Sequence, residues 1–346
     1  MAMKYLTPGP VQLPKMVIDA IARQPQFHRT DEFRATMRMV LEKLSKVYPY
    51  GQPIVMPGTG TFAVDVMVYN YIEPGDNVLV ISMGEFGERL SDSIESRGAK
   101  VIKLEYEIGG APSLDVVEDT AKKYDNISAI AVVHNETSAG VTYRYIEKLQ
   151  DVAYSVGAIL LVDSVSALPA EPIKSRVDVI ATASQKAFLA PPGAAILYVS
   201  REPRAKTRIP PSMDLTRYLK GIHIGDTPYT PPINVVYGLD ASLDYILGMG
   251  IDQYHAVHRE RAYILYTGLK LKPVPRDPYL WSYTVTAFYT EKGAGYIVRE
   301  LKKHGYVIAS GMGRYKDSII RIGVMGDIAR EDLEKVVEVV NSLVDQ

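Results

Sequence analysis

The sequence predicts an α/β protein, with a mostly parallel sheet between helices in a large domain and a smaller C-terminal α+β domain. Between about residues 50 and 200, short runs rich in Val and Ile alternate with amphipathic stretches. Such alternation is typical of βα units, whose parallel strands are buried under helices on both faces. After about residue 210 the alternation stops and prolines become frequent. We therefore expect the large domain at 20–250 and the small domain at 251–346, with residues 1–19 packing against the small domain.

The strands expected in the large domain are short apolar runs. They are NVLVIS (77–82), AKVIKL (99–104), SAIAVVH (128–134), AILLVD (158–163), VDVIATA (177–183) and AAILYVS (194–200). Helical patterns follow the first three runs, at 85–97, 113–123 and 145–156. Because ligands of open parallel sheets usually bind beyond the carboxyl ends of the strands, the polar residues there are the first candidates for a site. These residues are Ser82, His134, Asp163 and Ser184.

The C-terminal part mixes both kinds of element. Residues 233–248 and 253–271 have a helical pattern, and 283–290 and 318–325 are expected to be strands, with the helical stretch 294–305 between them. Residues 329–344 form an amphipathic pattern with an acidic first turn, which is typical of a helix.

Composition excludes several classes of function. The 346 residues include no cysteine, so disulfides, thiolate nucleophiles and cysteine-based zinc sites are excluded. The six histidines contain no HExxH pair, and we expect no metal site. A net charge of −1 favours neither nucleic acid nor an anionic membrane surface as a partner. No apolar run is long enough to span a membrane, and the N-terminal residues lack a signal-peptide pattern, so we expect a cytoplasmic protein.

Two residues together suggest covalent cofactor chemistry. Asp163 ends an apolar strand, and Lys186 follows the next one in SQKAFLAPPG (184–193). Taken singly, each has an ordinary explanation: a helix cap for Asp163, and a lysine whose stem lies along apolar surface for Lys186. A desolvated lysine can also form a Schiff base, and a pyridoxal phosphate (PLP) cofactor requires such a lysine and a carboxylate for its ring nitrogen.

A glycine turn supplies a third feature. In PGTGTFAVDVMV (57–68), Gly58 and Gly60 precede a helical pattern that starts at about Thr61. A helix N-terminus offers free N–H groups to a phosphate. The same letters also fit a loose G-x-G-x-x-A dinucleotide fingerprint, and a plain turn is the simplest alternative. These features alone are therefore compatible with two classes of enzyme, a nicotinamide-dependent oxidoreductase and a PLP-dependent enzyme.

Eight segments carry a resemblance to a known family. The sequence resembles the class V PLP-dependent aminotransferases, and among them the alanine–glyoxylate / serine–pyruvate (serine–glyoxylate) group. The resemblance implies the PLP-dependent transferase fold type I. The segments, in the family's order, are LTPGPVQLP with FHRTDEF, PGTGTFAVD, MGEFGERL, VVHNETSAGV, LLVDSVSAL, SQKAFLAPPG and SGMGRYKDSIIRIGVMG.

The resemblance assigns roles around the cofactor. Lys186 would form the Schiff base with PLP and then act as general base and acid. Asp163 would pair with the protonated ring nitrogen, and Phe86 would stack on the ring. Thr137 would bind the phenolic oxygen, with His134 and Glu136 shaping the turn. The remaining cofactor-binding positions, on the phosphate side, are Gly58, Thr59, Gly60, Thr61 and Gln185.

The resemblance also assigns a partner and a substrate side. Thr230 would reach the phosphate of a neighbouring subunit, which implies a homodimer with shared active sites. The family often has Tyr at the position of Thr227, so that aromatic contact is in doubt. Arg321 would bind the substrate carboxylate, although an arginine paired to a nearby glutamate is the simpler alternative. Gly9 would bring the main chain close to the substrate.

The function implied is a ping-pong transamination from a small amino acid, alanine or serine, to a small 2-oxo acid, glyoxylate or pyruvate. Alternatives are another class V reaction such as aminoethylphosphonate–pyruvate transamination, the nicotinamide-dependent reaction, and a non-catalytic PLP-binding dimer. No second cation is clearly placed for an acidic substrate side chain, although Arg29, Arg34 and Arg314 could serve from loops.

Overall fold

A computed structural model describes residues 3–345; residues 1, 2 and 346, which the expected terminal ranges include, lie outside the described residues. Within residues 3–345 the main sheet has seven strands in the order β2-β10-β9-β8-β5-β3-β4. β10 runs antiparallel to both of its neighbours, and the remaining adjacent pairs are parallel. The predicted mostly parallel sheet is therefore confirmed. The strands are β2 (Gln52–Gly58), β3 (Asn77–Ser82), β4 (Lys100–Glu105), β5 (Ile127–Val133), β8 (Ile159–Asp163), β9 (Val179–Ala183) and β10 (Gly193–Val199).

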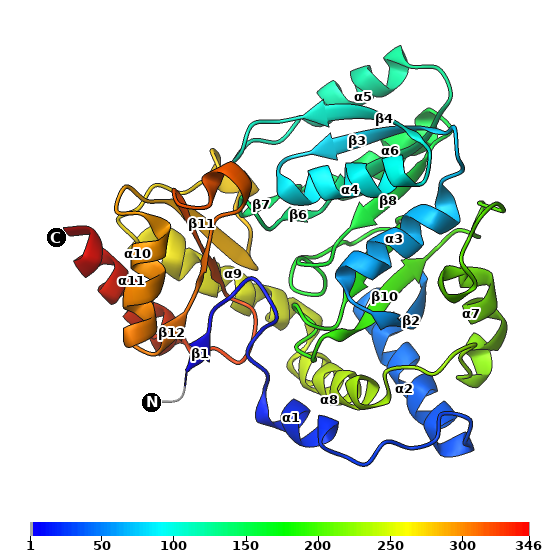
Figure 1. The fold of residues 1–346 in the computed structure, drawn as a ribbon, viewed down its shortest axis with the longest axis horizontal. Coiled ribbons are helices and arrows are strands. Elements are labelled where there is room, and N and C mark those ends of the chain that lie inside the picture. Colours follow the sequence, from blue (N-terminus) through cyan, green and yellow to red (C-terminus); the bar gives the residue numbers. More distant parts are fainter. Residues whose placement is uncertain (1–2, 346) are drawn as a thin grey trace.

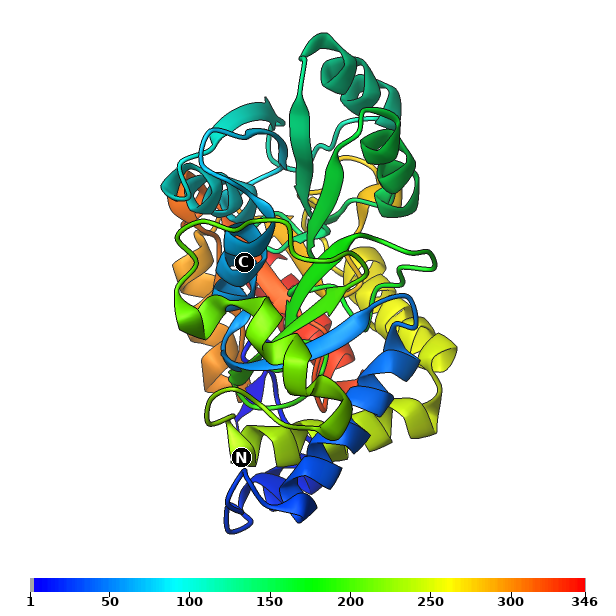
Figure 2. The same ribbon diagram turned by 90° about the vertical axis from the view of Figure 1, so that its right-hand side faces the viewer.

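Helices cover both faces of this sheet, as its almost wholly buried strands require. Helices α3 (Gly60–Tyr71) and α4 (Glu85–Ser96) lie on one face, and α6 (Ile146–Ser155) lies on the other with α5 (Leu114–Lys123) beside it (Figures 1 and 2). Helix α4 shows why: its buried residues Leu90, Ser91 and Ile94 form one stripe against the sheet. A short hairpin of β6 (Asn135–Glu136) and β7 (Val141–Thr142) follows β5.

Further helices, which are not part of the alternating strands and helices, pack near the edge of the main sheet that β2 and β10 form. Helices α1 (Lys15–Ile21) and α2 (Asp31–Val47) both contact α8 (Ile233–Met249). The proline-rich excursion before α8 contains η1 (Pro211–Met213), α7 (Leu215–Gly221) and η2 (Ile222–Ile224). Asp214 begins α7 by accepting a hydrogen bond from the Thr216 N–H.

The C-terminal part has its own sheet and apolar core. Strands β11, β14 and β13 form an antiparallel sheet, with α9, α10 and α11 packed around it. The N-terminal strand β1 (Lys4–Tyr5) pairs with β12, so residues 4 and 5 lie against this part of the molecule (Figure 1). The division near residue 250 stays a prediction. The elements are α9 (Ile251–Gly268), η3 (Pro278–Leu280), β11 (Val285–Tyr289), α10 (Ala294–Lys303), β12 (Tyr306–Val307), β13 (Ala309–Ser310), η4 (Gly313–Tyr315), β14 (Ile319–Gly323) and α11 (Arg330–Asp345).

None of the helices between residues 3 and 345 combines the length and the apolar composition that crossing a membrane requires.

Candidate active site

A cavity of about 220 Å³ opens at the carboxyl edge of the main sheet. The ends of β5 and β8 form its floor, and the first turns of α3 and α4 form its walls. Seven of the predicted cofactor residues meet there: Gly60, Thr61, Phe86, Thr137, Asp163, Gln185 and Lys186. The other lining residues are Val64, Asp65, Arg89, Leu90, Val133, Asn135, Val165 and Ser166.

Lys186 lies in the turn that follows β9, with its side chain in the cavity. Its Nζ donates a hydrogen bond to the main-chain oxygen of Pro8 at 2.6 Å. Burial, followed by the charge of Arg321, lowers the pKa of Lys186 to about 8, although Asp163 opposes the shift. A lowered pKa increases the neutral, nucleophilic fraction of the amine near pH 7.

Asp163 ends β8 at the bottom of the same cavity. Its Oδ1 accepts the Val165 N–H at 2.9 Å, and within residues 3–345 Oδ2 has no hydrogen-bond donor. Burial raises the pKa of Asp163 to about 6, against the opposing hydrogen bond from Val165. A buried carboxylate with a free oxygen is suited to a cationic ligand atom, because such an atom would offset the cost of burying the charge.

The N-terminus of α3 faces the cavity as the predicted anion site. The first hydrogen-bonded N–H of this helix is that of Ala63, which donates to the Thr59 oxygen, so the N–H groups before it are free for a ligand. Gln185 also lines the cavity, and its side-chain amide N–H groups are donors that a phosphate could accept. Gly58 ends β2 and Thr59 precedes α3, and neither residue lines the cavity.

Gly60 is required by close packing. A Cβ at this position would lie 2.4 Å from Cγ1 of Val165, a distance that side chains do not tolerate. Val165 itself lines the cavity, as does Phe86. The sequence analysis did not single out Val165, although it lies two residues after Asp163 within a motif that was recognised.

Glu136 fixes the first turn of α4, which carries Phe86. Its carboxylate accepts the N–H of Phe86 at 3.2 Å and that of Gly87 at 3.0 Å. It also accepts the hydroxyl of Ser138 at 2.5 Å. Burial raises the pKa of Glu136, and these hydrogen bonds oppose the rise. Glu136 thus ties the β6–β7 hairpin to the helix that carries the predicted ring-stacking residue.

Thr137 belongs to a buried chain of hydroxyl and amide groups. Its Oγ1 lies 2.6 Å from Oγ of Ser166, which donates to the main-chain oxygen of Asn135 at 3.1 Å. The Asn135 amide continues the chain to Oγ1 of Thr284 at 2.7 Å. Asn135 and Ser166 line the cavity but were missed from the sequence, since polar residues within a motif do not reveal which way they point.

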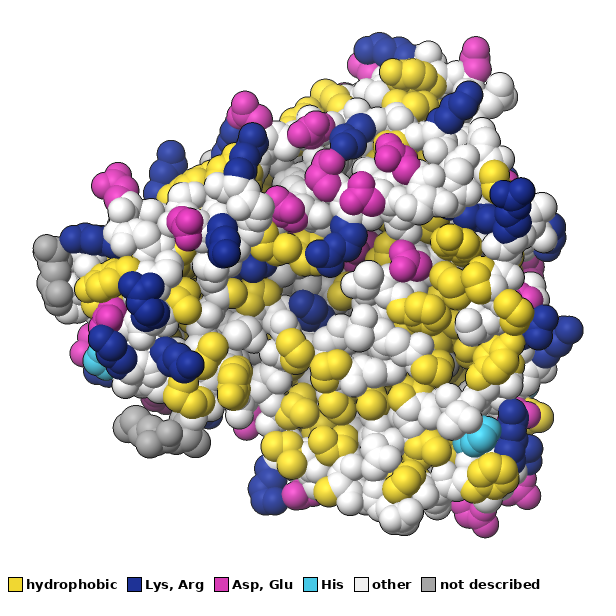
Figure 3. Space-filling model, in the orientation of Figure 1, with side chains coloured by type: hydrophobic (Ala, Val, Ile, Leu, Met, Phe, Trp, Pro, Cys, Tyr) yellow, Lys and Arg dark blue, Asp and Glu magenta, His cyan; other side chains and the backbone are white. Residues whose placement is uncertain are grey.

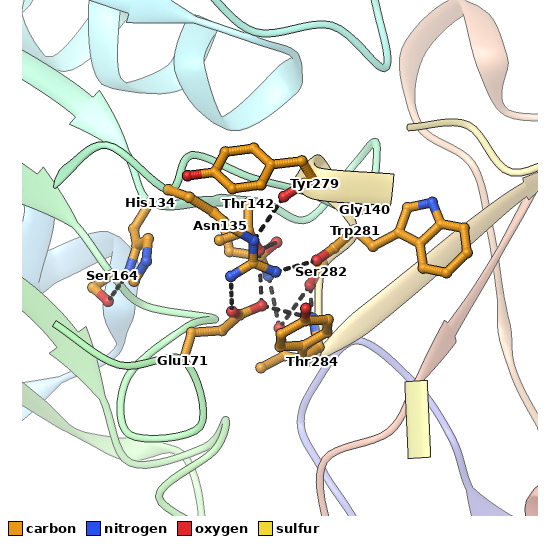
Figure 4. Close-up of polar contacts among 12 residues, drawn as sticks. His134, Asn135, Gly140, Thr142, Ser164, Glu171, Tyr279, Trp281, Ser282 and Thr284 are labelled. Carbon is orange, nitrogen blue, oxygen red and sulfur yellow. Dashed lines mark hydrogen bonds and ion pairs between the residues drawn. The ribbon is translucent and has the colours of Figure 1, made fainter. Parts of the chain in front are cut away.

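The other strand-end candidates have structural partners outside the cavity. His134 Nδ1 lies 3.0 Å from Oγ of Ser164 (Figure 4), and burial lowers the pKa of His134 to about 3. Ser82 donates to Glu88 at 2.6 Å, and Ser184 donates to the main-chain oxygen of Pro191 at 2.6 Å. Of the four strand-end residues, only Asp163 lines the cavity.

The predicted substrate side lies near Lys186 but outside the lining of the cavity. Arg321 Nε donates to the Ser310 oxygen at 2.9 Å, and Nη1 donates to the Thr137 oxygen at 3.4 Å. Burial lowers the pKa of Arg321, and the charge of Glu136 opposes the shift. Within residues 3–345 Arg321 nevertheless forms no ion pair, so Glu136 acts on it without direct contact. Gly9 adopts φ +118°, and a Cβ there would lie 2.5 Å from Cδ of Lys186. Only glycine therefore allows this close approach.

Arg89 is a cation in the cavity that the sequence analysis missed. Its guanidinium carbon lies 4.9 Å from the centre of the Phe86 ring, and within residues 3–345 it has no ion-pair partner. The arginines considered from the sequence lie elsewhere: Arg29 pairs with Asp226 at 2.7 Å, Arg34 pairs with Asp31 at 3.1 Å, and Arg314 lines a different cavity.

Thr230, the residue predicted to contact a partner subunit, is exposed and does not line the cavity of its own chain.

A buried ion pair holds the hairpin of Thr137 against the C-terminal part. Glu171 is fully buried and pairs with Arg144 at 3.0 Å. Arg144 also donates to the main-chain oxygens of Tyr279 and Trp281, at 2.7 and 2.5 Å (Figure 4). Glu171 in turn accepts the Thr142 hydroxyl at 2.8 Å. The segment before β11 is thereby fixed to the hairpin.

These groups define a class of enzyme: a lysine and a carboxylate share a cavity with a helix N-terminus, as the binding of a phosphorylated pyridine aldehyde requires. The chain belongs to the family described as Aminotransferase class-V, whose family model matches residues 6–312. Enzymes of this family use PLP, and the free oxygen of Asp163, the amine of Lys186 and the free N–H groups at the start of α3 fit it. The alternative of a nicotinamide-dependent oxidoreductase is therefore wrong.

Named relatives cover nearly the whole chain. The sequence is 31% identical to a serine–glyoxylate aminotransferase of Arabidopsis thaliana, across 93% of this chain and 85% of the relative. It is also 31% identical to an L-aspartate–glyoxylate aminotransferase of Paracoccus denitrificans, across 93% and 86%. The solved structure of an alanine–glyoxylate aminotransferase from Nostoc sp. superimposes with a TM-score of 0.90 at 26% identity, covering 99% of this chain and 95% of the other.

Proposed function

We propose that this aminotransferase moves the amino group of alanine or serine to glyoxylate or pyruvate by a ping-pong cycle. The observation that carries the proposal is that the Lys186 amine lies in the cofactor cavity, while Arg321 donates to the main-chain oxygen of Thr137, another residue that lines this cavity. An amino acid bound by its carboxylate at Arg321 would present its Cα to the lysine. The names of the relatives, two of which include serine or alanine with glyoxylate, support the substrate class.

Each of the chain's own groups has a task in this cycle. When bound, PLP supplies the aldehyde that carries the amino group and the ring that accepts electrons from the substrate Cα. Lys186 Nζ, with its pKa lowered to about 8, would take the proton from the substrate Cα and return it to the former aldehyde carbon on the other side of the amino nitrogen. Asp163 would keep the ring nitrogen protonated, and the Arg321 guanidinium would orient the substrate carboxylate through a two-pronged hydrogen bond.

The charges around the cavity support a small, uncharged substrate side chain. Arg29 and Arg34 are engaged by Asp226 and Asp31, and Arg314 lines the cavity of Glu85 and Glu88 instead. Arg89 does line the Lys186 cavity, but its guanidinium lies against the Phe86 ring and its charge acts on Asp163. We therefore expect Arg89 beside Phe86 and the cofactor rather than at the substrate side chain.

A panel of donors and acceptors tests the proposal. Purified enzyme is mixed with alanine, serine, aspartate or 2-aminoethylphosphonate, and the loss of the cofactor's visible absorbance is followed for each donor. The proposal expects kcat/KM for alanine or serine to exceed the others by tenfold or more. A preference for aspartate or the phosphonate would overturn the substrate assignment, and retained cofactor without reaction would indicate a non-catalytic PLP-binding protein.

We also propose a homodimer in which Thr230 contacts the phosphate bound by the partner subunit. Thr230 is exposed, and hydrophobic side chains gather over the lower half of the face in Figure 3, where α1, α2 and α8 lie. Several apolar side chains of this region are largely exposed: Met16, Ile18, Phe27, Met39 and Ile224. An exposed apolar surface of this kind marks an interaction site. Light scattering tests this proposal, because a homodimer has twice the mass of one chain. We further propose the cytoplasm as the location of the protein.

A further inference from the structure

Helix α9 lies between the turn of Lys186 and the C-terminal sheet (Figure 1). Tyr254, His258 and Arg261 are spaced four and three residues apart, so they share one face of this helix. Tyr254 and His258 are buried, with ring centres 4.4 Å apart, and Arg261 is half-buried. Neither Tyr254 nor Arg261 lines the cofactor cavity, yet each reaches a segment that carries a site residue.

At one end of this face, Tyr254 holds the turn of Lys186. Its Oη donates to the main-chain oxygen of Ala187, the next residue after the lysine, at 2.5 Å. The bond lies in an apolar cluster with Leu189 and Ile246, so the carbonyl would lack a partner without the tyrosine hydroxyl. Leu189 adopts φ +53°, a conformation that non-glycine residues rarely adopt. This turn therefore depends on the contacts that hold it.

At the other end, Arg261 holds the segment that follows β14, the strand of Arg321. Its guanidinium donates to the main-chain oxygens of Val324, Gly326 and Ile328, at 3.2, 3.1 and 2.5 Å. The planar fork of an arginine can satisfy several carbonyls at fixed angles, which makes this a stiff connection.

We propose that α9 is a brace that sets the position of the Lys186 amine relative to the Arg321 guanidinium, with Tyr254 and Arg261 as its positioning residues. The inference rests on the proposed function, in which a single amino acid must meet both groups at once. The two groups lie on different sheets, and α9 bonds directly to both segments. A misplacement of about 1 Å in such a site can lower the rate about 100-fold.

The variant Tyr254→Phe tests the lysine end in the holoenzyme. We expect kcat to fall at least tenfold, while KM for the amino acid changes less than about threefold, because Arg321 keeps its position. The pH at which the absorbance of the bound cofactor changes should rise by about half a unit, since a loosened turn admits water and favours the charged form. Asp163, Arg321 and Arg89 are the charges that face Lys186, and none of them is altered.

Tyr198→Phe is the matched control. Tyr198 is also fully buried and donates to a main-chain oxygen, that of Leu44 at 3.0 Å, at the far end of β10. Both variants should lose similar thermal stability, and Tyr198→Phe should leave kcat and the absorbance titration unchanged. If the two variants give the same kinetics and titration, Tyr254 has only a structural role and the proposal is wrong.

The variant Arg261→Gln tests whether Arg261 positions the segment that follows β14. It also provides the test of the brace if Tyr254→Phe does not fold. We expect KM for both the amino acid and the 2-oxo acid to rise about tenfold with a smaller change in kcat, and Arg261→Lys to recover part of the affinity. Arg259→Gln, an exposed position of the same helix, is the control. An unchanged KM in Arg261→Gln would show that Arg261 does not position Arg321.

If the wild-type enzyme transaminates no amino acid, the proposed function fails. The absorbance titration of Tyr254→Phe would still show whether Tyr254 positions Lys186.

Discussion

The Lys186 amine donates a hydrogen bond to the main-chain oxygen of Pro8, 178 residues earlier in the chain, at 2.6 Å. The N-terminal segment therefore contacts the Lys186 side chain although it does not line the cavity, while β1 anchors the same segment to β12. Through this contact the main chain of residues 8 and 9 lies directly against the predicted catalytic lysine.

Removal of the lysine should abolish the covalent attachment of PLP. In wild-type enzyme, reduction with borohydride is expected to fix the cofactor on the peptide that contains Lys186. Lys186→Ala should show no fixed cofactor and a transamination rate lower by 10²-fold or more, in line with the loss of a general base of about 10²–10⁴-fold. Lys103→Ala, an outer-surface lysine paired with Glu88, is the control. Labelling of any other peptide would contradict the assignment.

Asp163→Asn should stabilise the cofactor-free protein at neutral pH. Burial raises the pKa of Asp163 to about 6, above its ordinary value of about 3.9. The folded state thus binds more protons than the unfolded state between about pH 4 and 6, so wild-type stability falls as the pH rises through this range. We expect the variant to exceed wild type by about 2–3 kcal/mol above pH 6 and by nothing below pH 4. Urea unfolding at several pH values measures the difference.

The same variant should bind PLP more weakly, because the amide cannot neutralise a protonated ring nitrogen. A charged hydrogen bond of this kind contributes about 1.5–3 kcal/mol, so the dissociation constant should rise at least tenfold. Equal PLP affinity in both proteins would remove Asp163 from the cofactor site.

Arg321→Lys should impair substrate binding and spare the cofactor. Lysine keeps the charge but not the two-pronged geometry, so KM for amino and oxo acids should rise by tenfold or more. The absorbance of bound PLP should be unchanged, since Arg321 does not line the cofactor cavity. Unaltered steady-state kinetics would exclude Arg321 from the substrate site.

Thr230→Ala should weaken the retention of PLP during gel filtration or dialysis, because a hydroxyl–phosphate hydrogen bond from the partner subunit is lost. Thr120→Ala, at a partly exposed position of α5, is the control. Normal retention by Thr230→Ala would count against a phosphate site shared between subunits.

Glu171→Gln should destabilise the fold through a buried, unpaired arginine. Glu171 is fully buried against Arg144, and removal of one partner from such a pair costs about 3–5 kcal/mol. Glu338→Gln removes an exposed partner of Lys335 and should cost less than about 1 kcal/mol. A similar melting temperature for the two variants would show that the buried pair contributes no more than the exposed one.

Six of the seven strands of the main sheet and the two central site residues follow from the sequence alone, whereas the edge strand β2 was not predicted. Burial under helices imposes apolar runs on parallel strands, and this is a local property that can be counted along the chain. Asp163 and Lys186 stand immediately after such runs, and Gly60 stands at the start of a helix, so their meeting at one edge of the sheet could be predicted.

The surroundings of these residues depend on the tertiary structure. The Pro8 oxygen beside Lys186, Arg89 rather than Arg314 in the cavity, and the Tyr254 hydroxyl behind the lysine turn come from segments far apart in the chain. Sequence periodicity indicates which face of an element is buried, but not which distant main-chain group lies against it. Hydrogen bonds and charges act over a few ångströms, so their partners are decided only when the packed segments bring them together.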